Sequence, residues 1–318
     1  MKTTLTILFS LILISSFGQT QGDKIASIKK EQDEKQKQIR ANAGEEILKI
    51  NDTFYVLQPL GIVAGNLLVF ITSEGLLMVD DQWEIVADLI SEKISQFSDK
   101  PLKYIINTHH HDDHIDGNKA FGKQNVKIIA HQFVRNTLQS LTNVYTAGEV
   151  LENYPTYALP STVFKNEMTL FFDDEPIVLK HFGNGHTGGD IIIHFKKSNI
   201  IHAGDSFVTY GYPFVDLNNG GSFEGFIRTL DGIISMADEN TIIIPGHGPF
   251  CSVDDVKVLR NIIQEHFTMT KKGLEMGWSV ATIANKIESE LKPWDIKPPI
   301  IIYESKEAYI RKIIESLQ

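Results

Sequence analysis

The residues best suited to chemistry form one short cluster, Asn107-Thr108-His109-His110-His111-Asp112-Asp113-His114-Ile115-Asp116-Gly117. From His109 to His114 every residue is an imidazole or a carboxylate, and neither lysine nor glutamate interrupts the run. Neutral imidazole nitrogens and ionised carboxylates are the ligands that zinc and other borderline divalent ions prefer. An ordinary polar turn does not require this composition, so the cluster predicts a metal site.

Three further stretches occupy the same kind of position, where an apolar strand gives way to a glycine-rich loop. They contain His186 (Gly183-Asn184-Gly185-His186-Thr187-Gly188-Gly189-Asp190), Asp205 (His202-Ala203-Gly204-Asp205-Ser206) and His247 (Pro245-Gly246-His247-Gly248). Glycine lets the backbone bend tightly, and loops at strand ends often carry catalytic groups. Taken singly, each residue has an ordinary structural interpretation. His186 could form a hydrogen bond within a turn, Asp205 could cap a helix, and His247 could pack within its loop. Together with His109, His111, Asp113 and His114 they supply five imidazoles and two carboxylates, enough for two metal ions.

The elements that must position these residues follow from the apolar pattern. Strand-like runs cover 47–50, 53–57, 66–71, 76–80, 102–106 and 126–130, and then 168–172, 177–181, 191–195, 199–202 and 241–244. Helical spacing marks 84–97, 133–141, 223–236, 254–271, 282–291 and the tail from 305. Asp116 is expected to cap a short helix that starts near Gly117. The chain thus passes twice through strands followed by helices, which predicts an α+β fold of four αββα layers, two sheets face to face with helices outside.

The motifs, in this order, resemble the metallo-β-lactamase superfamily. The resemblance is carried by His109-x-His111-x-Asp113-His114, Gly-x-His186-Thr-Gly, Gly204-Asp205 and Gly246-His247-Gly248, over about residues 47–251. Asp80 resembles the family's early aspartate, which supports a metal ligand. The resemblance implies the αββα fold and a dinuclear zinc hydrolase. It also implies a site in which one Zn²⁺ is held by His109, His111 and His186, and a second by Asp113, His114 and His247, with Asp205 bridging both.

The spacing of the first motif agrees with this arrangement. In extended chain, residues two apart point the same way, so His109 and His111 can face one metal while His110 points elsewhere. Water bound to zinc can have its pKa lowered to about 7, which supplies hydroxide to attack a carbonyl. Asp113 can hold the nucleophile's proton and pass it to the leaving group, which makes it the catalytic residue. We expect a small ester, lactone, thioester or lactam as substrate.

Departures from the family pattern keep other functions open. True zinc β-lactamases mostly place Cys, Ser or another residue at the position of Asp205. His114 with Asp205 is similar to the glyoxalase II, lactonase and related hydrolase branch, but the stretch before His186 lacks the proline common in glyoxalase II. A true β-lactamase, an iron-dependent persulfide dioxygenase and a protein with a purely structural metal site are the alternatives.

The other polar residues near these motifs receive ordinary interpretations. His110, His131, His181, His194, His202 and His266 are expected to support ligands, pack in the core or lie on the surface. Tyr210, Tyr212 and Asn219 follow Asp205 and are candidates to line the pocket, with an ordinary loop as the equal alternative. Cys251 is the only cysteine, so no intrachain disulfide can form, and we expect a buried, inert thiol rather than a ligand.

Composition and the two chain ends bound the partners and the location. With 318 residues, 42% of them hydrophobic, the chain can bury a large core. Its net charge of −10 disfavours nucleic acid as a binding partner.

Residues 1–18 have the basic start, short apolar run and small residues of a secretory signal peptide, which predicts a periplasmic or secreted protein with no membrane attachment after cleavage. We expect a polar segment at 19–45, either an exposed helix or a tether. A catalytic domain at 46–270 and a helical extension at 271–318 follow. No pattern indicates an oligomeric state.

Overall fold

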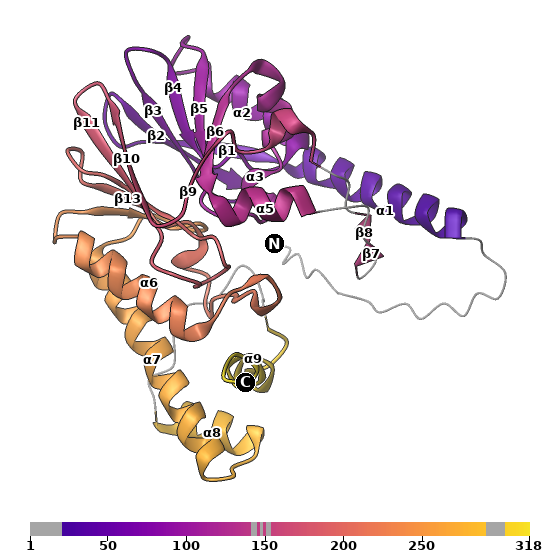
Figure 1. Ribbon diagram of the computed structural model, residues 1–318, viewed down its shortest axis with the longest axis vertical. Coiled ribbons are helices and arrows are strands. Elements are labelled where there is room, and N and C mark those ends of the chain that lie inside the picture. Colours follow the sequence, from indigo (N-terminus) through magenta and orange to yellow (C-terminus); the bar gives the residue numbers. More distant parts are fainter. Residues whose placement is uncertain (1–20, 141–144, 147–148, 151–153, 291–302) are drawn as a thin grey trace, which may run out of the picture.

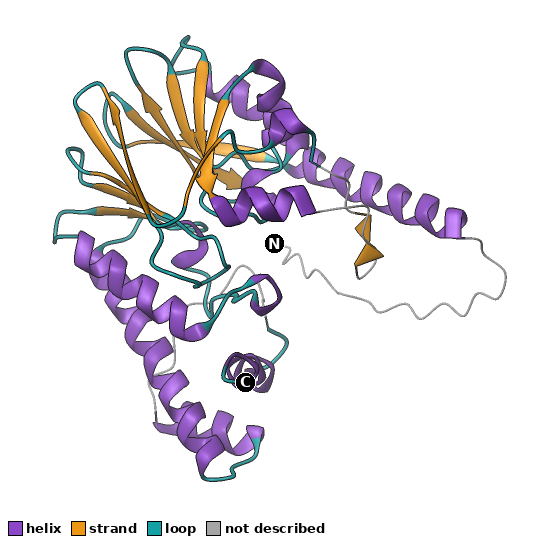
Figure 2. Ribbon diagram, viewed as in Figure 1, coloured by secondary structure: helices purple, strands orange, loops and turns teal. Residues whose placement is uncertain are grey.

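The computed structural model describes residues 21–140, 145–146, 149–150, 154–290 and 303–318. The expected signal peptide lies outside the described residues. Two β-sheets face one another, and helices cover their outer surfaces (Figures 1 and 2). This arrangement confirms the predicted four-layer αββα fold.

The first sheet is mixed and has the order β1-β2-β3-β4-β5-β6-β9. Its strands are β1 (Gly44–Lys49), β2 (Phe54–Leu60), β3 (Leu67–Ile71), β4 (Leu76–Val79), β5 (Leu102–Ile106), β6 (Lys127–His131) and β9 (Thr162–Phe164). Neighbours from β1 to β4 are antiparallel, and those from β4 to β9 are parallel. Helix α2 (Ala87–Ile94) packs on the outer face, and α5 (Gln132–Ser140) follows β6.

The second sheet has the order β10-β11-β12-β13-β14. Its strands are β10 (Glu167–Phe172), β11 (Glu175–Lys180), β12 (Ile192–Phe195), β13 (Ile200–His202) and β14 (Ile242–Ile244), with only β13 and β14 pairing in parallel. Its outer face packs against α6 (Phe223–Met236) and α7 (Val253–Glu275). Helices α8 (Val280–Glu290) and α9 (Lys306–Ser316) pack against α7 and continue the same apolar core away from the sheet (Figure 1). Because α7 runs through residue 270, the predicted domain boundary falls inside a helix, and the division into domains stays a prediction.

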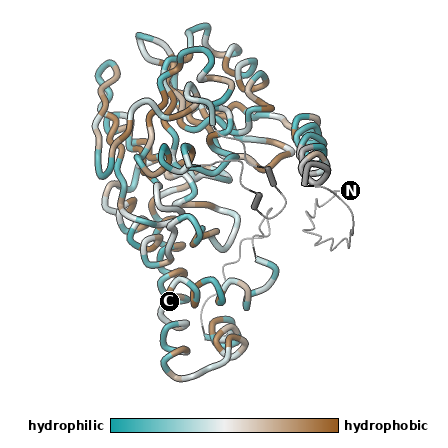
Figure 3. Tube along the Cα trace, turned by 45° about the vertical axis from the view of Figure 1, so that its right-hand side comes forward, coloured by the Kyte–Doolittle hydropathy of each residue, from teal (hydrophilic) through white to brown (hydrophobic). Residues whose placement is uncertain are grey.

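Alternation along the strands divides the core between the layers. In β3, Leu68 and Phe70 face the space between the sheets, whereas Leu67 and Val69 pack toward α2. Successive strand residues point to opposite faces, so a strand buried on both sides is apolar throughout. Hydrophobic colour accordingly follows the strands in Figure 3. The result is a rigid double sheet whose strand ends hold the polar loops.

The polar N-terminal segment forms helix α1 (Gln21–Asn42), which extends from the body of the fold in Figure 1. The turns of α1 that are coloured in Figure 3 are mostly hydrophilic. Its last turn is anchored, because Ile39 packs beside the α2 core and Arg40 pairs with Asp88 at 2.9 Å. Among the described residues, no helix combines the length and hydrophobicity needed to cross a bilayer.

Short elements complete the described chain. These are the helical turns α3 (Asp112–Ile115) and α4 (Asn118–Phe121), the strand pair β7 (Tyr145–Thr146) and β8 (Glu149–Val150), and the 3-10 turns η1 (Glu84–Val86), η2 (Gly122–Gln124), η3 (Thr156–Ala158), η4 (Gly204–Ser206) and η5 (Leu217–Asn219). The prediction that Asp116 caps the helix after it is wrong. Asp116 is the C-cap residue of α3, and the N-cap position of α4 is Gly117, with no side-chain cap. Asp116 Oδ2 instead accepts from the amide of Glu84 at 3.1 Å.

Candidate metal centre

The ends of strands from both sheets meet at one edge of the sandwich. The His109–His114 cluster follows β5, and His186 lies in the loop between β11 and β12. Asp205 follows β13, and His247 follows β14, the parallel neighbour of β13. All seven residues predicted from the sequence are brought together there, in groups whose ligand atoms lie within 4.8 Å of one another.

The first group contains His109, His111 and His186. The Nδ1 atom of His111 lies 2.9 Å from Nε2 of His186. The other ring nitrogens are hydrogen-bonded outside the group, because His111 Nε2 lies 3.0 Å from Asp216 Oδ2 and His186 Nδ1 donates to the Phe214 carbonyl at 2.8 Å. The Nε2 atom of His109 is buried and has no hydrogen-bond partner among the described residues.

These hydrogen bonds determine what the first group can bind. A carbonyl oxygen only accepts, so His186 carries its proton on Nδ1 and presents a lone pair at Nε2. Asp216 favours the matching tautomer of His111, in which Nδ1 presents a lone pair. Two lone pairs facing each other at 2.9 Å require a shared proton or a metal cation between the rings. The donor set therefore fits a metal ion.

The second group contains Asp113, His114 and His247. The Nε2 atom of His247 lies 3.3 Å from Asp113 Oδ2 and 3.3 Å from His114 Nε2. Behind it, Asp80 Oδ2 lies 2.8 Å from His114 Nδ1, as the resemblance predicted for this aspartate. Asp80 has a φ of 59°, uncommon for a non-glycine residue, and its carboxylate accepts at 2.7 Å from both the amide and the hydroxyl of Thr108.

Asp205 lies between the two groups, with one oxygen toward each. Its Oδ1 is 3.2 Å from His114 Nε2 and 3.4 Å from His247 Nε2. Its Oδ2 is 3.7 Å from His186 Nε2. The residue is buried, so this carboxylate is held among imidazoles rather than hydrated.

The two groups differ in how readily they take up protons. Burial lowers the pKa of His109 well below its ordinary value and that of His186 to about 4. Burial also opposes protonation of His111, but Asp216 outweighs it and raises the pKa. In the second group burial is likewise outweighed by the carboxylates of Asp205 and Asp113, which raise the pKa of His247 to about 9 and that of His114 well above its ordinary range.

The carboxylates respond in the opposite direction. Burial raises the pKa of Asp113, but His114 and His247 outweigh it, and the net pKa is lowered. The same two histidines bring the pKa of Asp205 well below its ordinary value in spite of burial. Both carboxylates are therefore ionised and available as ligands.

Two contributions to the site were missed from the sequence. Asp216 orients His111 and also forms a third group with His111 and His110, whose ring packs near Phe133. Gly65 makes room for His114, because a Cβ atom there would lie 2.4 Å from Cε1 of that ring. A lone aspartate in a Gly/Asn-rich loop and a distant glycine give no periodic signal, so only the folded loops reveal them.

The remaining candidates lie around the centre or away from it. The Tyr210 ring lies 5.7 Å from that of His247, and Asn219 Nδ2 donates to Asp216 at 2.7 Å. Tyr212 instead stacks on Tyr309. Cys251 belongs to none of the metal-binding groups and is only half-buried, with its thiol donating to the Pro249 carbonyl at 3.3 Å.

Comparison with known proteins supports the same family. Residues 66–247 match the model of the metallo-β-lactamase superfamily. The chain is 25% identical to the metallo-β-lactamase type 2 of Bacillus cereus over 263 residues, covering 78% of this chain and 94% of that protein.

Solved structures show the same fold at lower identity. A metallo-β-lactamase from Pontibacter korlensis aligns with a TM-score of 0.56 and 16% identity, over 70% of this chain and 99% of its own. The sec-alkylsulfatase Pisa1 from Pseudomonas sp. aligns with a TM-score of 0.64 and 14% identity, over 88% of this chain and 51% of its own. With the family model and the assembled His/Asp groups, these likenesses identify the chain as a member of the metallo-β-lactamase superfamily and a metal-dependent hydrolase.

Proposed function

We propose that the seven converging residues hold two zinc ions and that the protein hydrolyses a small ester, lactone, thioester or lactam. The observation that carries this proposal is the position of Asp205, whose two oxygens face different ligand groups. Three histidines on one side and Asp113, His114 and His247 on the other complete the two sets of ligands. A carboxylate shared in this way can bridge two metal ions at the spacing of about 3.5–4 Å found in two-metal hydrolytic centres.

The donor set fits zinc, which binds imidazole nitrogens and carboxylate oxygens. When bound, zinc supplies a water of lowered pKa and polarises the carbonyl under attack. Asp80, Asp216 and the Phe214 carbonyl each accept from the far nitrogen of a ligand histidine, which fixes the orientation of its ring.

Asp113 is the group we assign to proton transfer. It is ionised, because His114 and His247 lower its pKa, so it can accept the proton of the nucleophile and deliver it to the leaving group. Its side chain is 18% exposed and that of His111 is 21% exposed, whereas His109, His114 and His186 are almost fully buried. The substrate therefore approaches from the side of Asp113 and His111.

Metal analysis with a substrate panel tests this function. The purified chain is stripped with a chelator, reloaded with zinc or with iron, and assayed on a lactone, a thioester, an aryl ester, nitrocefin and an alkyl sulfate. We expect two zinc ions per chain and turnover of a carboxylic substrate. One iron per chain with oxygen uptake would instead establish the persulfide dioxygenase.

Asp113→Asn separates catalysis from a structural role. The amide cannot accept the proton, so we expect turnover to fall roughly 100-fold or more, in line with general acid–base contributions of about 10²–10⁴. Unchanged turnover in a folded variant would contradict the role of Asp113. No turnover of any substrate by the zinc-loaded, unaltered chain would favour a structural site.

A β-lactam is the second candidate substrate, because the relative from Bacillus cereus is named as a metallo-β-lactamase. Nitrocefin turnover exceeding that of the lactone and thioester would assign this activity.

We also propose export, supported by the signal-like sequence of residues 1–18. A mature N-terminus near residue 19 in a periplasmic or culture fraction is the expected result, and an intact Met1 in the cytosol would refute it.

A further inference from the structure

The loop between Asp205 and α6, residues 207–222, carries groups that hold three of the ligand histidines. The Phe214 carbonyl accepts from His186 Nδ1 at 2.8 Å, and Asp216 lies 3.0 Å from His111 Nε2. The hydroxyl of Thr209 donates to the His247 carbonyl at 3.2 Å. The conformation of this loop therefore sets the orientation of ligands, above all in the group of His109, His111 and His186.

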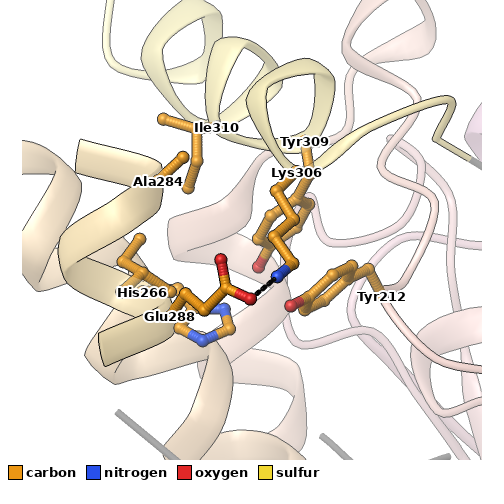
Figure 4. A pocket seen from close by; sticks show the side chains of 8 residues that line it. Tyr212, His266, Ala284, Glu288, Lys306, Tyr309 and Ile310 are labelled. Atoms are coloured by element: carbon orange, nitrogen blue, oxygen red, sulfur yellow. Dashed lines mark ion pairs between the residues drawn. The ribbon is translucent and has the colours of Figure 1, made fainter. Parts of the chain in front are cut away.

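The opposite side of the same loop is held by the C-terminal part of the chain, beyond the residues that match the family model. The Tyr303 hydroxyl donates to the Pro213 carbonyl at 3.1 Å. In α9, the ring of Tyr309 stacks on that of Tyr212, with centroids 4.3 Å apart and planes 10° from parallel. Figure 4 shows Tyr212 and Tyr309 side by side at the junction of the loop with α9.

This contact is buried and tied to the body of the fold. Tyr309 is 1% exposed and belongs to the core formed with α6 and α7. Tyr212, Tyr309 and His266 line a cavity of ≈ 40 Å³, and the Glu288–Lys306 ion pair at 2.5 Å joins α8 to α9 beside it (Figure 4). The loop 207–222 therefore contacts the metal centre on one side and the packed helical layer on the other.

We propose that Tyr303 is a positioning residue for the metal centre. Through the backbone of the loop, Tyr303 holds His186 in its ligand orientation. Pro213 and Phe214 are neighbours, so the carbonyl held by Tyr303 belongs to the peptide that leads directly into Phe214. Displacement of that peptide moves the Phe214 carbonyl away from His186 Nδ1, which frees the His186 ring to rotate. This inference rests on the proposed two-zinc centre.

The chain provides a matched control for the loss of a hydroxyl. The Tyr309 hydroxyl is buried and has no hydrogen-bond partner among the described residues, whereas the Tyr303 hydroxyl has Pro213. Tyr303→Phe removes the hydroxyl that bonds to the loop backbone at Pro213 and Val215. Tyr309→Phe removes a hydroxyl from the same aromatic cluster but keeps the stacking on Tyr212. Neither residue touches the metal centre.

The test measures zinc release from the full-length protein into a chromophoric chelator. A lost hydrogen bond has a net value of about 0.5–1.5 kcal/mol, so we expect Tyr303→Phe to release one of its two zinc ions roughly threefold to tenfold faster than the unaltered chain. Tyr309→Phe should stay within about twofold, on the same grounds, because it breaks no hydrogen bond.

Two further measurements distinguish a positioning role of Tyr303 from a general loss of stability. The metal-free variants should unfold at similar denaturant concentrations, and crystals of Tyr303→Phe treated briefly with chelator should lose metal first between His109, His111 and His186. Equal release by Tyr303→Phe and the unaltered chain, or equal acceleration by both variants, would overturn the inference. Failure of the unaltered chain to bind zinc would refute the proposed centre itself.

Discussion

The two halves of the metal centre differ in the charges around their histidines and therefore in the pKa values of those histidines. Apart from the shared Asp205, the group of His109, His111 and His186 contains only imidazoles, and burial keeps His186 neutral, with a pKa of about 4. The group of Asp113, His114 and His247 includes a carboxylate, and its histidines hold protons to high pH, with a pKa of about 9 for His247. In the first half, His109 and His186 present lone pairs that are ready for a cation, and only His111 has a raised pKa. In the second half, both His114 and His247 must release a proton to bind one.

This difference shows how one set of strand ends can prepare two unequal sites. The first half is preorganised by hydrogen bonds to a backbone carbonyl and to Asp216. The second is preorganised by charge, because Asp80, Asp113 and Asp205 surround His114. Asp205 belongs to both halves, and so it links two sites of unequal proton demand.

The largest effect is expected from Asp205→Asn, which alters both halves at once. The amide replaces one ligand oxygen with a donor group, so both ligand groups lose a negative charge and one loses a ligand atom. Loss of a residue that merely orients a ligand costs about 10–100-fold in affinity, so this change should exceed 100-fold. Competition with a chelator measures it, and retention of two tightly bound zinc ions would show that Asp205 does not bridge.

A smaller and selective effect is expected from the matched pair Asp80→Asn and Asp216→Asn. Each removes the carboxylate behind one ligand histidine, His114 for Asp80 and His111 for Asp216. We expect about 10–100-fold weaker binding of one zinc ion in each variant, at opposite halves. Stepwise zinc titration with crystallographic occupancy identifies the half affected, and the same weakened site in both variants would contradict the division into halves.

The smallest effect concerns the stability of the metal-free protein as pH changes. The folded pKa of His247, about 9, lies above its ordinary value of 6.5, so its stabilising contribution is complete below pH 6.5 and is lost as pH rises through about 9. The folded pKa of His186, about 4, lies below 6.5, so its contribution is complete above pH 6.5 and is lost as pH falls through about 4.

Each contribution is on the order of 1–3 kcal/mol, from the size of a pKa shift in free-energy terms. The free energy of unfolding by urea should therefore fall on both sides of pH 6.5 in the metal-free protein. His247→Asn should reduce the loss of stability on the alkaline side more than the loss on the acid side, where His186 is unchanged. If His247→Asn changed the pH dependence of stability equally on the acid and alkaline sides, the proposed difference in protonation between the two halves would be contradicted.

Most of the helices and strands could be predicted from the pattern of apolar residues in the sequence. The helical spacing at 223–236 predicted α6 with its observed bounds. The strand runs predicted the strands of both sheets except β9, because a short apolar run bounded by turn residues is a local signal. The seven candidate ligands converge as predicted because each follows a strand, and strand ends share an edge of the sandwich.

The supporting residues were less accessible because their roles depend on contacts between distant segments. Asp216 and His111 are 105 residues apart, and nothing in the Gly/Asn-rich loop marks Asp216 as the partner. Asp116 was assigned a local role as a cap, but the chain before it forms its own helical turn, and its carboxylate turns to Glu84 instead. Local rules fail where a side chain serves a neighbouring element.

The most direct test of the two-halved centre is a crystal structure of the zinc-loaded protein with anomalous scattering measured at the zinc edge. Two peaks separated by about 3.5–4 Å are expected, the spacing of two-metal hydrolytic sites. One should lie among His109, His111 and His186 and the other among Asp113, His114 and His247, with Asp205 between them. A single peak, or a peak between His110 and Asp216, would contradict the account.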